Sequence, residues 1–327
     1  MNRAMIVGTG AAVPKRILSN ADLEKLVETS DEWITTRTGI RERHIAADGE
    51  HFSDLCTRAA EAALKRAHVK PEDLDMILVG TISGDMPFPA TSCLVQRNLG
   101  ATRAAASDVS AACVGFLYAL HLADGLIGAG KAANVLVIGG EILSRIVDWT
   151  DRNTCVLFGD GAGAVVLQKT KGDHGILGSL MKSNGNYHDF ICMPGGGSDR
   201  PANDPKSIEE RLPYIKMKGN ETFKVAVKAM SDVSHELLSE QGFTHEQIDL
   251  FIPHQANLRI IDAVGEKLKI DPRKVYKNID RFGNTSAASI PIALDECVRE
   301  NRVKTGDMVL MTAFGAGLVW GSVLLRW

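Results

Sequence analysis

The chain has 327 residues, of which 45% are hydrophobic and 24% are charged, and its formal net charge is −3 at pH 7. This balance is typical of a soluble globular protein, excludes a disordered or fibrous one, and gives no reason to expect nucleic-acid binding. No apolar run approaches the roughly 20 residues that span a bilayer, so we expect no association with a membrane.

The six cysteines are scattered along the chain, with neither a CxxC pair nor a zinc-like spacing. A chain of this length does not depend on disulfides. The N-terminus enters a β-rich run at once and lacks the apolar segment of a signal peptide. These features predict reduced thiols and a cytoplasmic location. Cys56 and Cys297 lie in helical patterns, where a small buried residue is the expected role.

The first half of the chain alternates helices with strands rich in Val, Ile and Leu. A short strand begins near residue 5. Hydrophobic periodicity then predicts helices over 53–69 and 112–130 and strands over 75–81, 133–141 and 161–168. The second half repeats this order, with helices over 223–242 and 286–301 and strands over 248–255, 303–315 and 315–327. The alternation indicates parallel or mixed sheets covered by helices.

The two similar halves follow one another without a linker. A chain of this length exceeds the usual limit of a single core, so the repeat indicates one αβαβα layered body built by duplication. We place the halves at 1–175 and 176–327. Between them, the segment 193–213 is rich in Gly, Pro and Asp, and we expect an exposed excursion there. This excursion is either a functional lid or a passive surface insertion.

Cys113 is the first candidate for chemistry. It lies in SDVSAACVGF, immediately before a long helical pattern, and therefore in the first turn of a helix. Free N–H groups and the positive end of the helix dipole stabilise a thiolate, so we expect a pKa below the free value of about 8.5. Small neighbours leave room for a substrate to reach the sulfur. The alternative reading of Cys113 is a small buried hydrophobic residue.

His254 and Asn284 are the other two candidates. His254 ends a predicted strand, where open α/β sheets face their ligand crevice, although a structural histidine is also compatible with this place. Asn284 lies in RFGNTSAAS, where a turn or capping asparagine is the alternative. The repeat brings them together: Cys113 and the GNTSAAS segment occupy equivalent helix N-termini, so pseudo-symmetry predicts that both lie at one central cleft.

Other motifs predict no further site. GTGAAV at 8–13 begins like a dinucleotide fingerprint but lacks its third glycine. His235 and Glu236 lack the second histidine of a zinc motif, and we expect no metal. GDGAGAVVL at 159–167 fits either an anion-binding turn or close strand–helix packing. His121 shares the helical face of Cys113, deeper in the core, and we expect it to be a buried structural histidine.

The longest motifs resemble a known family, the β-ketoacyl-acyl-carrier-protein synthases III of bacterial fatty acid synthesis. Besides the Cys113 segment they are TSDEWITTRTGIRERH at 29–44, DRNTCVLFGDGAGAVVL at 151–167, GNETFKVAV at 219–227, PHQANLRI at 253–260, DRFGNTSAAS at 280–289 and AFGAGLVWGS at 313–322. The resemblance extends over nearly the whole chain. It implies an α/β, thiolase-like duplicated αβαβα layered fold, with mixed five-stranded sheets in two pseudo-symmetric halves.

The resemblance also implies roles for individual residues. Cys113, His254 and Asn284 correspond to the catalytic set, and the N–H groups of Cys113 and Ala316 to the oxyanion donors. For coenzyme A and the substrate, the resemblance implies contacts with Trp33, Arg37, Arg152, Asn220, Asn257, Phe314 and Phe88, the last from a dimer mate. For acyl carrier protein, it implies contacts with Gln255, Asn257, Arg259 and Lys224. Basic residues suit an acidic partner. No metal or redox cofactor is implied.

One departure from the family concerns the oxyanion loop. Where many members have three consecutive glycines, this chain has Gly315-Ala316-Gly317, which retains the N–H but restricts the backbone. The expected reaction is decarboxylating condensation of an acyl-coenzyme A primer, acetyl-coenzyme A or similar, with malonyl-acyl carrier protein, through an acyl-cysteine and in a homodimer. The alternatives are a same-fold acyltransferase or condensing enzyme of secondary metabolism, a papain-like cysteine hydrolase, and a non-catalytic acyl-binding protein.

Overall fold

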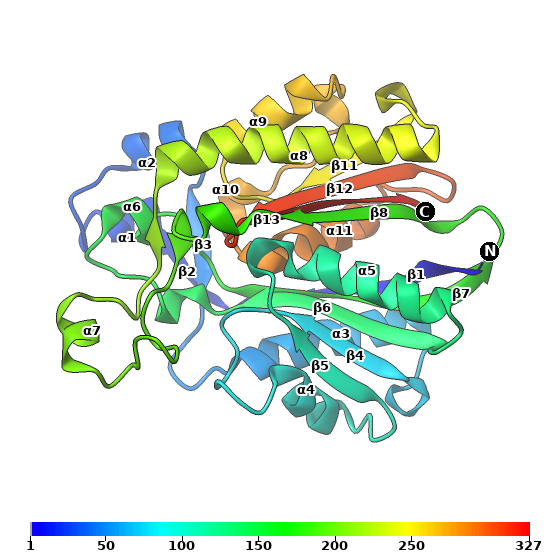
Figure 1. Cartoon of the computed structure of the whole chain (residues 1–327), viewed down its shortest axis with the longest axis horizontal. Helices are drawn as coiled ribbons and strands as arrows, with labels where there is room; N and C mark the ends of the chain where they lie inside the picture. Colours follow the sequence, from blue (N-terminus) through cyan, green and yellow to red (C-terminus); the bar gives the residue numbers. More distant parts are fainter. Residues whose placement is uncertain (1) are drawn as a thin grey trace.

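The computed structural model describes residues 2–327, so Met1 of the expected first half lies outside the described residues. Its first sheet has the order β1-β7-β6-β4-β5, with β4, β5 and β6 parallel and β7 antiparallel to both of its neighbours. The strands are β1 (Asn2–Ala12), β4 (Met76–Gly80), β5 (Ala105–Val109), β6 (Asn134–Glu141) and β7 (Gly161–Lys171). This sheet forms the lower part of the molecule in Figure 1.

The second sheet has the order β11-β12-β13-β8. Its strands are β8 (Gly175–Ser183), β11 (Leu250–Pro253), β12 (Met308–Gly315) and β13 (Val319–Arg326). Only β11 and β12 are parallel. The fifth strand of the expected sheet is reduced to an isolated bridge between Phe251 and Val275. The reason is local: Pro272–Lys274 forms a 3-10 turn just before the bridge, so little extended backbone remains to pair.

Helices cover and separate the two sheets. α5 (Gly115–Gly128) and α11 (Ser289–Arg299) contact strands of both sheets and form the central layer. α3 (Phe52–Ala67) and α4 (Thr91–Leu99) cover the first sheet, while α8 (Gly219–Gln241) and α9 (Leu258–Lys267) lie over the second. The layers confirm the predicted αβαβα fold. Cys56 in α3 and Cys297 in α11 are fully buried, as their helical patterns indicated.

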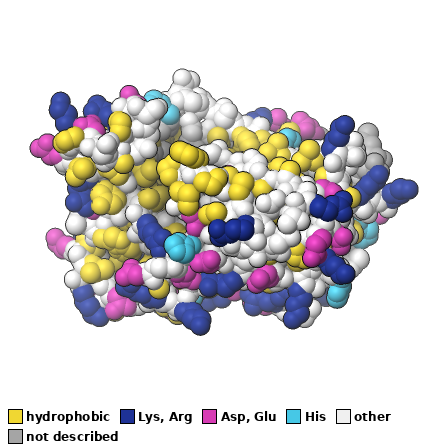
Figure 2. Space-filling view, turned by 90° about the horizontal axis from the view of Figure 1, so that it is seen from below, with side chains coloured by type: hydrophobic (Ala, Val, Ile, Leu, Met, Phe, Trp, Pro, Cys, Tyr) yellow, Lys and Arg dark blue, Asp and Glu magenta, His cyan; other side chains and the backbone are white. Residues whose placement is uncertain are grey.

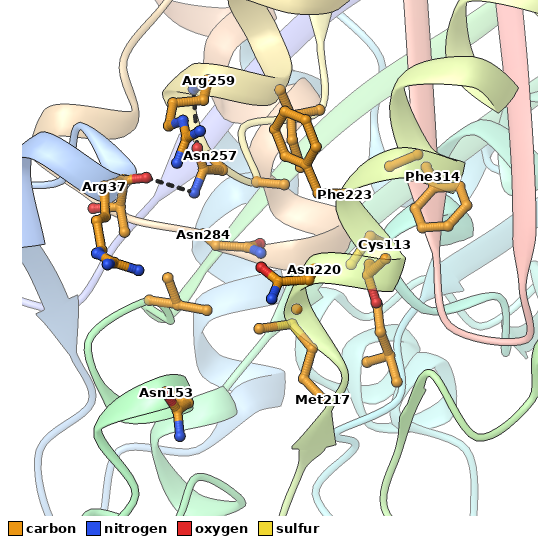
Figure 3. A pocket seen from close by; sticks show the side chains of 18 of the residues that line it. Arg37, Cys113, Asn153, Met217, Asn220, Phe223, Asn257, Arg259, Asn284 and Phe314 are labelled. Atoms are coloured by element: carbon orange, nitrogen blue, oxygen red, sulfur yellow. Dashed lines mark hydrogen bonds between the residues drawn. The ribbon is translucent and has the colours of Figure 1, made fainter.

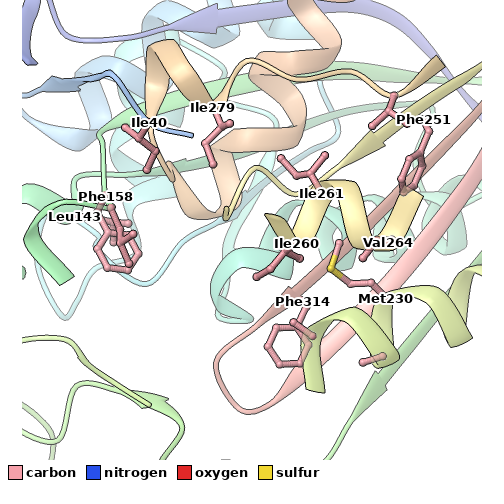
Figure 4. Packing of buried hydrophobic residues seen from close by; sticks show 14 of the residues in the cluster. Ile40, Leu143, Phe158, Met230, Phe251, Ile260, Ile261, Val264, Ile279 and Phe314 are labelled. Carbon is pink, nitrogen blue, oxygen red and sulfur yellow. The ribbon is translucent and has the colours of Figure 1, made fainter. Parts of the chain in front are cut away.

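The packing of α8 against α9 fixes the position of several residues that line the main cavity. Met230 of α8 meets Ile260 and Val264 of α9 in one buried cluster, and Phe314 at the end of β12 belongs to the same cluster (Figure 4). Burial of each such side chain contributes about 1.5–3 kcal/mol. The cluster therefore holds α9 and the end of β12 in fixed relative positions.

Glycines allow the close approach of the central helices to the first sheet. A Cβ on Gly80, at the end of β4, would lie 2.4 Å from the carbonyl carbon of Gly115. A Cβ on Gly139 in β6 would lie 2.2 Å from the carbonyl oxygen of Ala287. Both distances are too short for a real contact, so only glycine permits these helix starts to rest on the strands.

Shorter elements gather at one end of the layers. They are β2 (Arg16–Ser19), α1 (Asn20–Leu23), α2 (Asp31–Thr38), β3 (Glu42–Ile45), α6 (Arg152–Cys155), β9 (Ile191–Cys192), β10 (Lys216–Met217) and α10 (Ile279–Phe282). The segment 193–213, which contains α7 (Pro205–Glu209), projects beyond them and is mostly exposed (Figure 1). It is anchored by two hydrogen bonds from Arg211 to the buried carboxylate of Asp148, 2.5 and 2.6 Å long.

The two sheets separate cleanly along the chain. β7 of the first sheet ends at Lys171 and β8 of the second begins at Gly175. We propose the division of the chain into 1–175 and 176–327 on this basis. Within the described residues, none of the helices has both the length and the apolar character needed to cross a bilayer.

Candidate active site

A cavity of about 680 Å³ lies where the short elements meet the central helices. Ten of the expected residues line it: Trp33, Arg37, Cys113, Asn220, Lys224, His254, Asn257, Arg259, Asn284 and Phe314. The charged and aromatic residues at its mouth are at least partly exposed, whereas His254, Asn284 and Phe314 at its inner end are buried. Figure 3 shows Cys113 beside Phe314 on one side and Arg37 and Arg259 on the other.

Two short helical turns form the inner end. Ala112–Val114 leads into α5, and Ser286–Ala288 leads into α11. The two turns contact each other, and each contains a residue in the left-handed region, Ala112 at φ 44° and Ser286 at φ 50°. Such a φ is costly for a residue with a side chain, about 1 kcal/mol or more, and is concentrated at functional sites. The predicted meeting of equivalent helix starts is therefore present, on a strained backbone.

Cys113 is placed as expected but has a different pKa from the one predicted. Burial raises the pKa of its thiol to about 11, and a hydrogen bond with Ser286 opposes this only in part. The prediction of a lowered pKa was wrong because loss of solvent around the sulfur outweighs the helix N-terminus. Part of that crowding comes from β12, since a Cβ on Gly315 would lie 2.9 Å from the Cys113 nitrogen. At neutral pH Cys113 is a thiol.

His254 follows β11 and is held by the backbone and by one side chain. Its N–H donates to the carbonyl of Thr312 at 2.8 Å, and its Nδ1 lies 2.7 Å from the Ser289 hydroxyl. Burial lowers the pKa of the imidazole to about 3, so the ring is neutral at neutral pH. The Ser289 Oγ also accepts the Gln255 N–H at 3.4 Å, and its own proton is available for donation to Nδ1. The neutral ring then carries its own proton on Nε2.

Asn284 is fixed at both its backbone and its side chain. Its N–H donates to Leu157 O at 2.8 Å, and its carbonyl accepts from Gly159 at 3.0 Å. The side-chain Oδ1 accepts the N–H of Ser286 at 2.9 Å. Because the amide oxygen is hydrogen-bonded to Ser286, the NH2 group is the part of the side chain that is left for the cavity. An NH2 group can only donate hydrogen bonds. Asn284 and His254 thus both present hydrogen-bond donors near Cys113.

The mouth of the cavity carries a stack of two cations on one indole. The guanidinium carbons of Arg37 and Arg152 lie 4.9 and 5.1 Å from the centre of the Trp33 ring, and Arg152 also donates to Glu28 O at 3.0 Å. Contacts of this kind contribute about 0.5–1 kcal/mol at exposed sites. Arg37 is tied to α9, because Asn257 Nδ2 donates to its carbonyl at 3.0 Å (dashed in Figure 3).

Two expected positions differ in the structure. Gln255 is only 1% exposed: its amide donates to the carbonyls of Pro253 and Tyr276 and accepts the N–H of Asn278. It therefore has no surface to offer a carrier protein. His121 is exposed, with Nδ1 2.7 Å from Ser179 Oγ, so the prediction of a buried histidine was wrong. Its position on α5 faces the edge of the layer and not its centre.

Phe88 and Ala316 complete the expected set. Phe88 is 84% exposed and lies outside the cavity of its own chain. Ala316 belongs to the short connection between β12 and β13, directly after the glycine that contacts Cys113. No group of three His, Cys, Asp or Glu side chains among residues 2–327 has an arrangement that would hold a metal ion.

Sequence reasoning missed three residues of the site. Ser289 contacts His254, Ser286 contacts Cys113, and Glu141 lies behind Ser286 at the end of β6. The first two stand within GNTSAAS, where two serines beside two alanines were the available signal. Glu141 had a signal too, since a charged residue that ends an otherwise apolar strand is seldom buried without a partner.

Comparison with known proteins identifies close relatives along the whole chain. Residues 107–185 match the family model described as 3-oxoacyl-[acyl-carrier-protein (ACP)] synthase III, and residues 238–327 match the model of its C-terminal part. The β-ketoacyl-[acyl-carrier-protein] synthase III of Caldanaerobacter subterraneus subsp. tengcongensis is 53% identical, covering 99% of this chain and 98% of the relative. The corresponding protein of Aquifex aeolicus is 52% identical over 98% of this chain and 99% of its own.

A solved structure agrees with these matches. The crystal structure of 3-oxoacyl-[acyl-carrier-protein] synthase III from Aquifex aeolicus superimposes with a TM-score of 0.93 at 51% identity. The alignment covers 99% of this chain and all of that one. Fold and sequence thus point to the same set of proteins.

Proposed function

The chain belongs to the β-ketoacyl-acyl-carrier-protein synthase III family, and from that premise we propose that it condenses an acyl-coenzyme A primer with malonyl-acyl carrier protein. The observation that carries the proposal is the inner end of the cavity. There one thiol, Cys113, faces two hydrogen-bond donors, the NH2 of Asn284 and the neutral ring of His254. This set provides a nucleophile for one half-reaction and donors for the other.

In the first half-reaction Cys113 attacks the carbonyl carbon of the acyl-coenzyme A thioester. The N–H groups of Cys113 and Ala316 bind the oxygen of the tetrahedral intermediate, and each such donor is worth about 3 kcal/mol. Coenzyme A leaves as the carbonyl re-forms, and the acyl group remains on sulfur. Phe314, buried beside Cys113, keeps water away from this thioester.

In the second half-reaction the malonyl thioester takes the place of coenzyme A. His254 Nε2–H and Asn284 Nδ2–H donate to its carbonyl oxygen. Loss of carbon dioxide turns that oxygen into an enolate, which binds both donors more tightly than the ground-state carbonyl does. The enolate carbon then attacks the acyl group on Cys113. A neutral His254 suits this step, because it donates a hydrogen bond without giving up its proton.

The coenzyme A path runs from Trp33 and Arg152 past Arg37, Asn220 and Asn257 to Cys113. The present stack of Arg152 on Trp33 leaves no room for a base between them, so adenine enters only when this guanidinium moves. The carbonyl and amide groups along the path suit the two amides of a pantetheine arm. Thr222 and Met217 line the remaining wall.

The carrier protein approaches the same mouth. Lys224 and Arg259 are exposed and line the cavity, and Arg259 is steadied by the Phe223 ring 5.6 Å away. Cations at this rim attract an acidic partner and orient its arm toward the cavity. Gln255 contributes only indirectly, by holding the segment that carries Asn257 and Arg259.

Two copies of the chain pair through the outer edge of the first sheet. β5 is an edge strand, and an unpaired edge attracts another strand. Hydrophobic side chains gather on the face seen from below (Figure 2). Exposed apolar residues are Ile82, Met86 and Phe88, between β4 and α4, and Leu122 in α5. Phe88 of one copy then reaches the cavity of the other.

All six cysteines are free, which suits the cytoplasm.

The test follows the two half-reactions separately. The protein is incubated with a panel of acyl-coenzyme A thioesters and its intact mass is measured, after which malonyl-acyl carrier protein is added. We expect one acyl adduct on Cys113 and its discharge as β-ketoacyl-acyl carrier protein. Absence of any adduct contradicts the proposal. An adduct that malonyl-acyl carrier protein does not discharge favours the same-fold acyltransferase of secondary metabolism instead.

A further inference from the structure

Glu141 is a buried acid that the two half-reactions above do not use. It ends β6 and is fully buried. Its Oε2 accepts hydrogen bonds from Thr81 Oγ1 at 2.9 Å, from the N–H groups of Ile82 and Ser83 at 3.1 and 3.0 Å, and from the Ser83 hydroxyl. Its Oε1 has only longer contacts, 3.3 Å to Ile82 N and 3.3 Å to Ser286 Oγ. The oxygen that faces Ser286 is therefore the one with capacity for a proton.

Ser286 links this acid to the nucleophile. Its hydroxyl donates to Glu141 Oε1 at 3.3 Å and is also a hydrogen-bond partner of the Cys113 thiol, so it connects the thiol to the carboxyl. A hydroxyl can accept one proton while it donates another, which is the requirement for a relay.

The thiol needs such a partner. Burial keeps Cys113 protonated, with a pKa of about 11, and lowers the pKa of His254 to about 3, which makes the imidazole a weak base. Burial also raises the pKa of Glu141, to about 7, because desolvation outweighs its hydrogen bonds. At neutral pH a substantial fraction of Glu141 is a carboxylate, and of these groups it is the base best matched to the working pH.

We propose that Glu141 accepts the proton of the Cys113 thiol through the Ser286 hydroxyl as Cys113 attacks the acyl thioester, and returns it when Cys113 is released in the condensation. This inference rests on the proposed function. Glu141 touches no reacting atom and acts through Ser286.

The steps balance. In acylation the Sγ–C bond forms and the bond from carbon to the sulfur of coenzyme A breaks. The thiol proton moves to Ser286 Oγ while the hydroxyl proton moves to Glu141 Oε1, and coenzyme A leaves as a thiolate that solvent protonates. In condensation the C–C bond forms and the Sγ–C bond breaks. The proton then returns from Oε1 through Ser286 to the sulfur.

Few ionisable groups face Glu141 from the elements packed against it. The thiols of Cys113 and of Cys56 in α3 both sense its charge. The charges of Asp85 and Asp108 also raise the pKa of Cys56. Titration of Glu141 near neutrality is thus separated from that of the thiols, whose pKa values are raised.

The experiment measures single-turnover acylation by acetyl-coenzyme A, with quenching and intact mass, from about pH 5.5 to about pH 9.5. In the wild type we expect the rate to rise with pH and level off above about 7, because ionised Glu141 is the acceptor. Glu141→Gln keeps the shape of the side chain and removes the base. We expect about 10- to 100-fold slower acylation at pH 8. The rate should then rise through the whole range without the break, following the thiol itself.

Two further variants test the relay independently of how well Glu141→Gln folds. Ser286→Ala leaves Glu141 and its other donors in place, and it should reproduce the altered profile, with no added loss in the double variant. Thr81→Val removes a donor to the carboxylate, which raises its pKa, so the break should move to higher pH but persist.

Three results would overturn the relay: a wild-type break retained in Glu141→Gln, a wild-type profile in Ser286→Ala, or equal slowing at every pH. Failure of the wild type to form any adduct would instead contradict the proposed function.

Discussion

The turn that begins α5 and the turn that begins α11 occupy equivalent places in the two halves, yet they carry different chemistry. Both place one residue at a positive φ, and both rest on a glycine of the first sheet. In the first turn the residue after the strained one is Cys113; in the second it is Ala287. The second turn has no thiol: its Ser286 is a hydrogen-bond partner of Cys113, and the flanking Asn284 and Ser289 contact Ser286 and His254, respectively. The duplicated fold thus provides two facing turns, one with the proposed nucleophile and the other with the side chains that we expect to support it.

The variant with the largest expected effect removes the difference between the two turns. Cys113→Ala gives the first turn the side chain of Ala287, and we expect no acyl adduct with any acyl-coenzyme A, measured by intact mass. The matched control is Cys93→Ala in α4, a free cysteine outside the cavity, which should acylate normally. An adduct that persists in Cys113→Ala would show that another residue is the nucleophile.

The next effect separates the two half-reactions. Asn284→Ala should leave acylation within about twofold of the wild type and slow discharge by malonyl-acyl carrier protein about 10²- to 10³-fold, as loss of one donor to an oxyanion does. Because Oδ1 also accepts from Ser286, Asn284→Asp is a useful companion: it keeps this acceptor and loses the donor. Equal loss in both steps for both variants would contradict the assigned role.

A smaller effect concerns the tautomer of His254. Ser289→Ala removes the hydroxyl that lies 2.7 Å from Nδ1, so the proton is no longer confined to Nε2. We expect about a tenfold slower decarboxylating step, unchanged acylation, and a shift of the imidazole ¹⁵N signals toward a mixture of tautomers. Unchanged ¹⁵N signals would mean that the backbone environment alone fixes the ring.

The smallest effect is on stability. A Cβ in Gly139→Ala would meet the Ala287 carbonyl oxygen at 2.2 Å, so we expect a loss of about 1–3 kcal/mol in the free energy of unfolding, measured by denaturant titration. Gly125→Ala in α5 is the control, because nothing lies within 4 Å of its added Cβ. There alanine should stabilise the helix by up to about 1 kcal/mol. Equal stability of the two variants would show that the second turn can shift without cost.

Much of this arrangement was accessible from the sequence. The order of helices and strands, the duplication and the meeting of Cys113 with the GNTSAAS segment all follow from patterns that are local or repeated. The pKa of Cys113 was not accessible, because it depends on crowding by segments as distant as Gly315. The predictions of a carrier-protein contact for Gln255 and of burial for His121 failed for a related reason. The exposure of each side chain depends on how its segment packs against its neighbours, which periodicity alone does not fix.

The stack of Arg152 on Trp33 has a consequence for turnover. In the proposed coenzyme A path the Arg152 guanidinium lies 5.1 Å from the centre of the indole on which we expect the adenine to stack, so it would compete with the nucleotide. Once the acyl group is on Cys113, return of Arg152 to the ring would favour expulsion of spent coenzyme A. In the proposed mechanism both thioesters use the same channel, so the second arm enters only after the first has left. The stack would therefore weaken binding of the first substrate, acyl-coenzyme A, and speed the entry of the second, malonyl-acyl carrier protein.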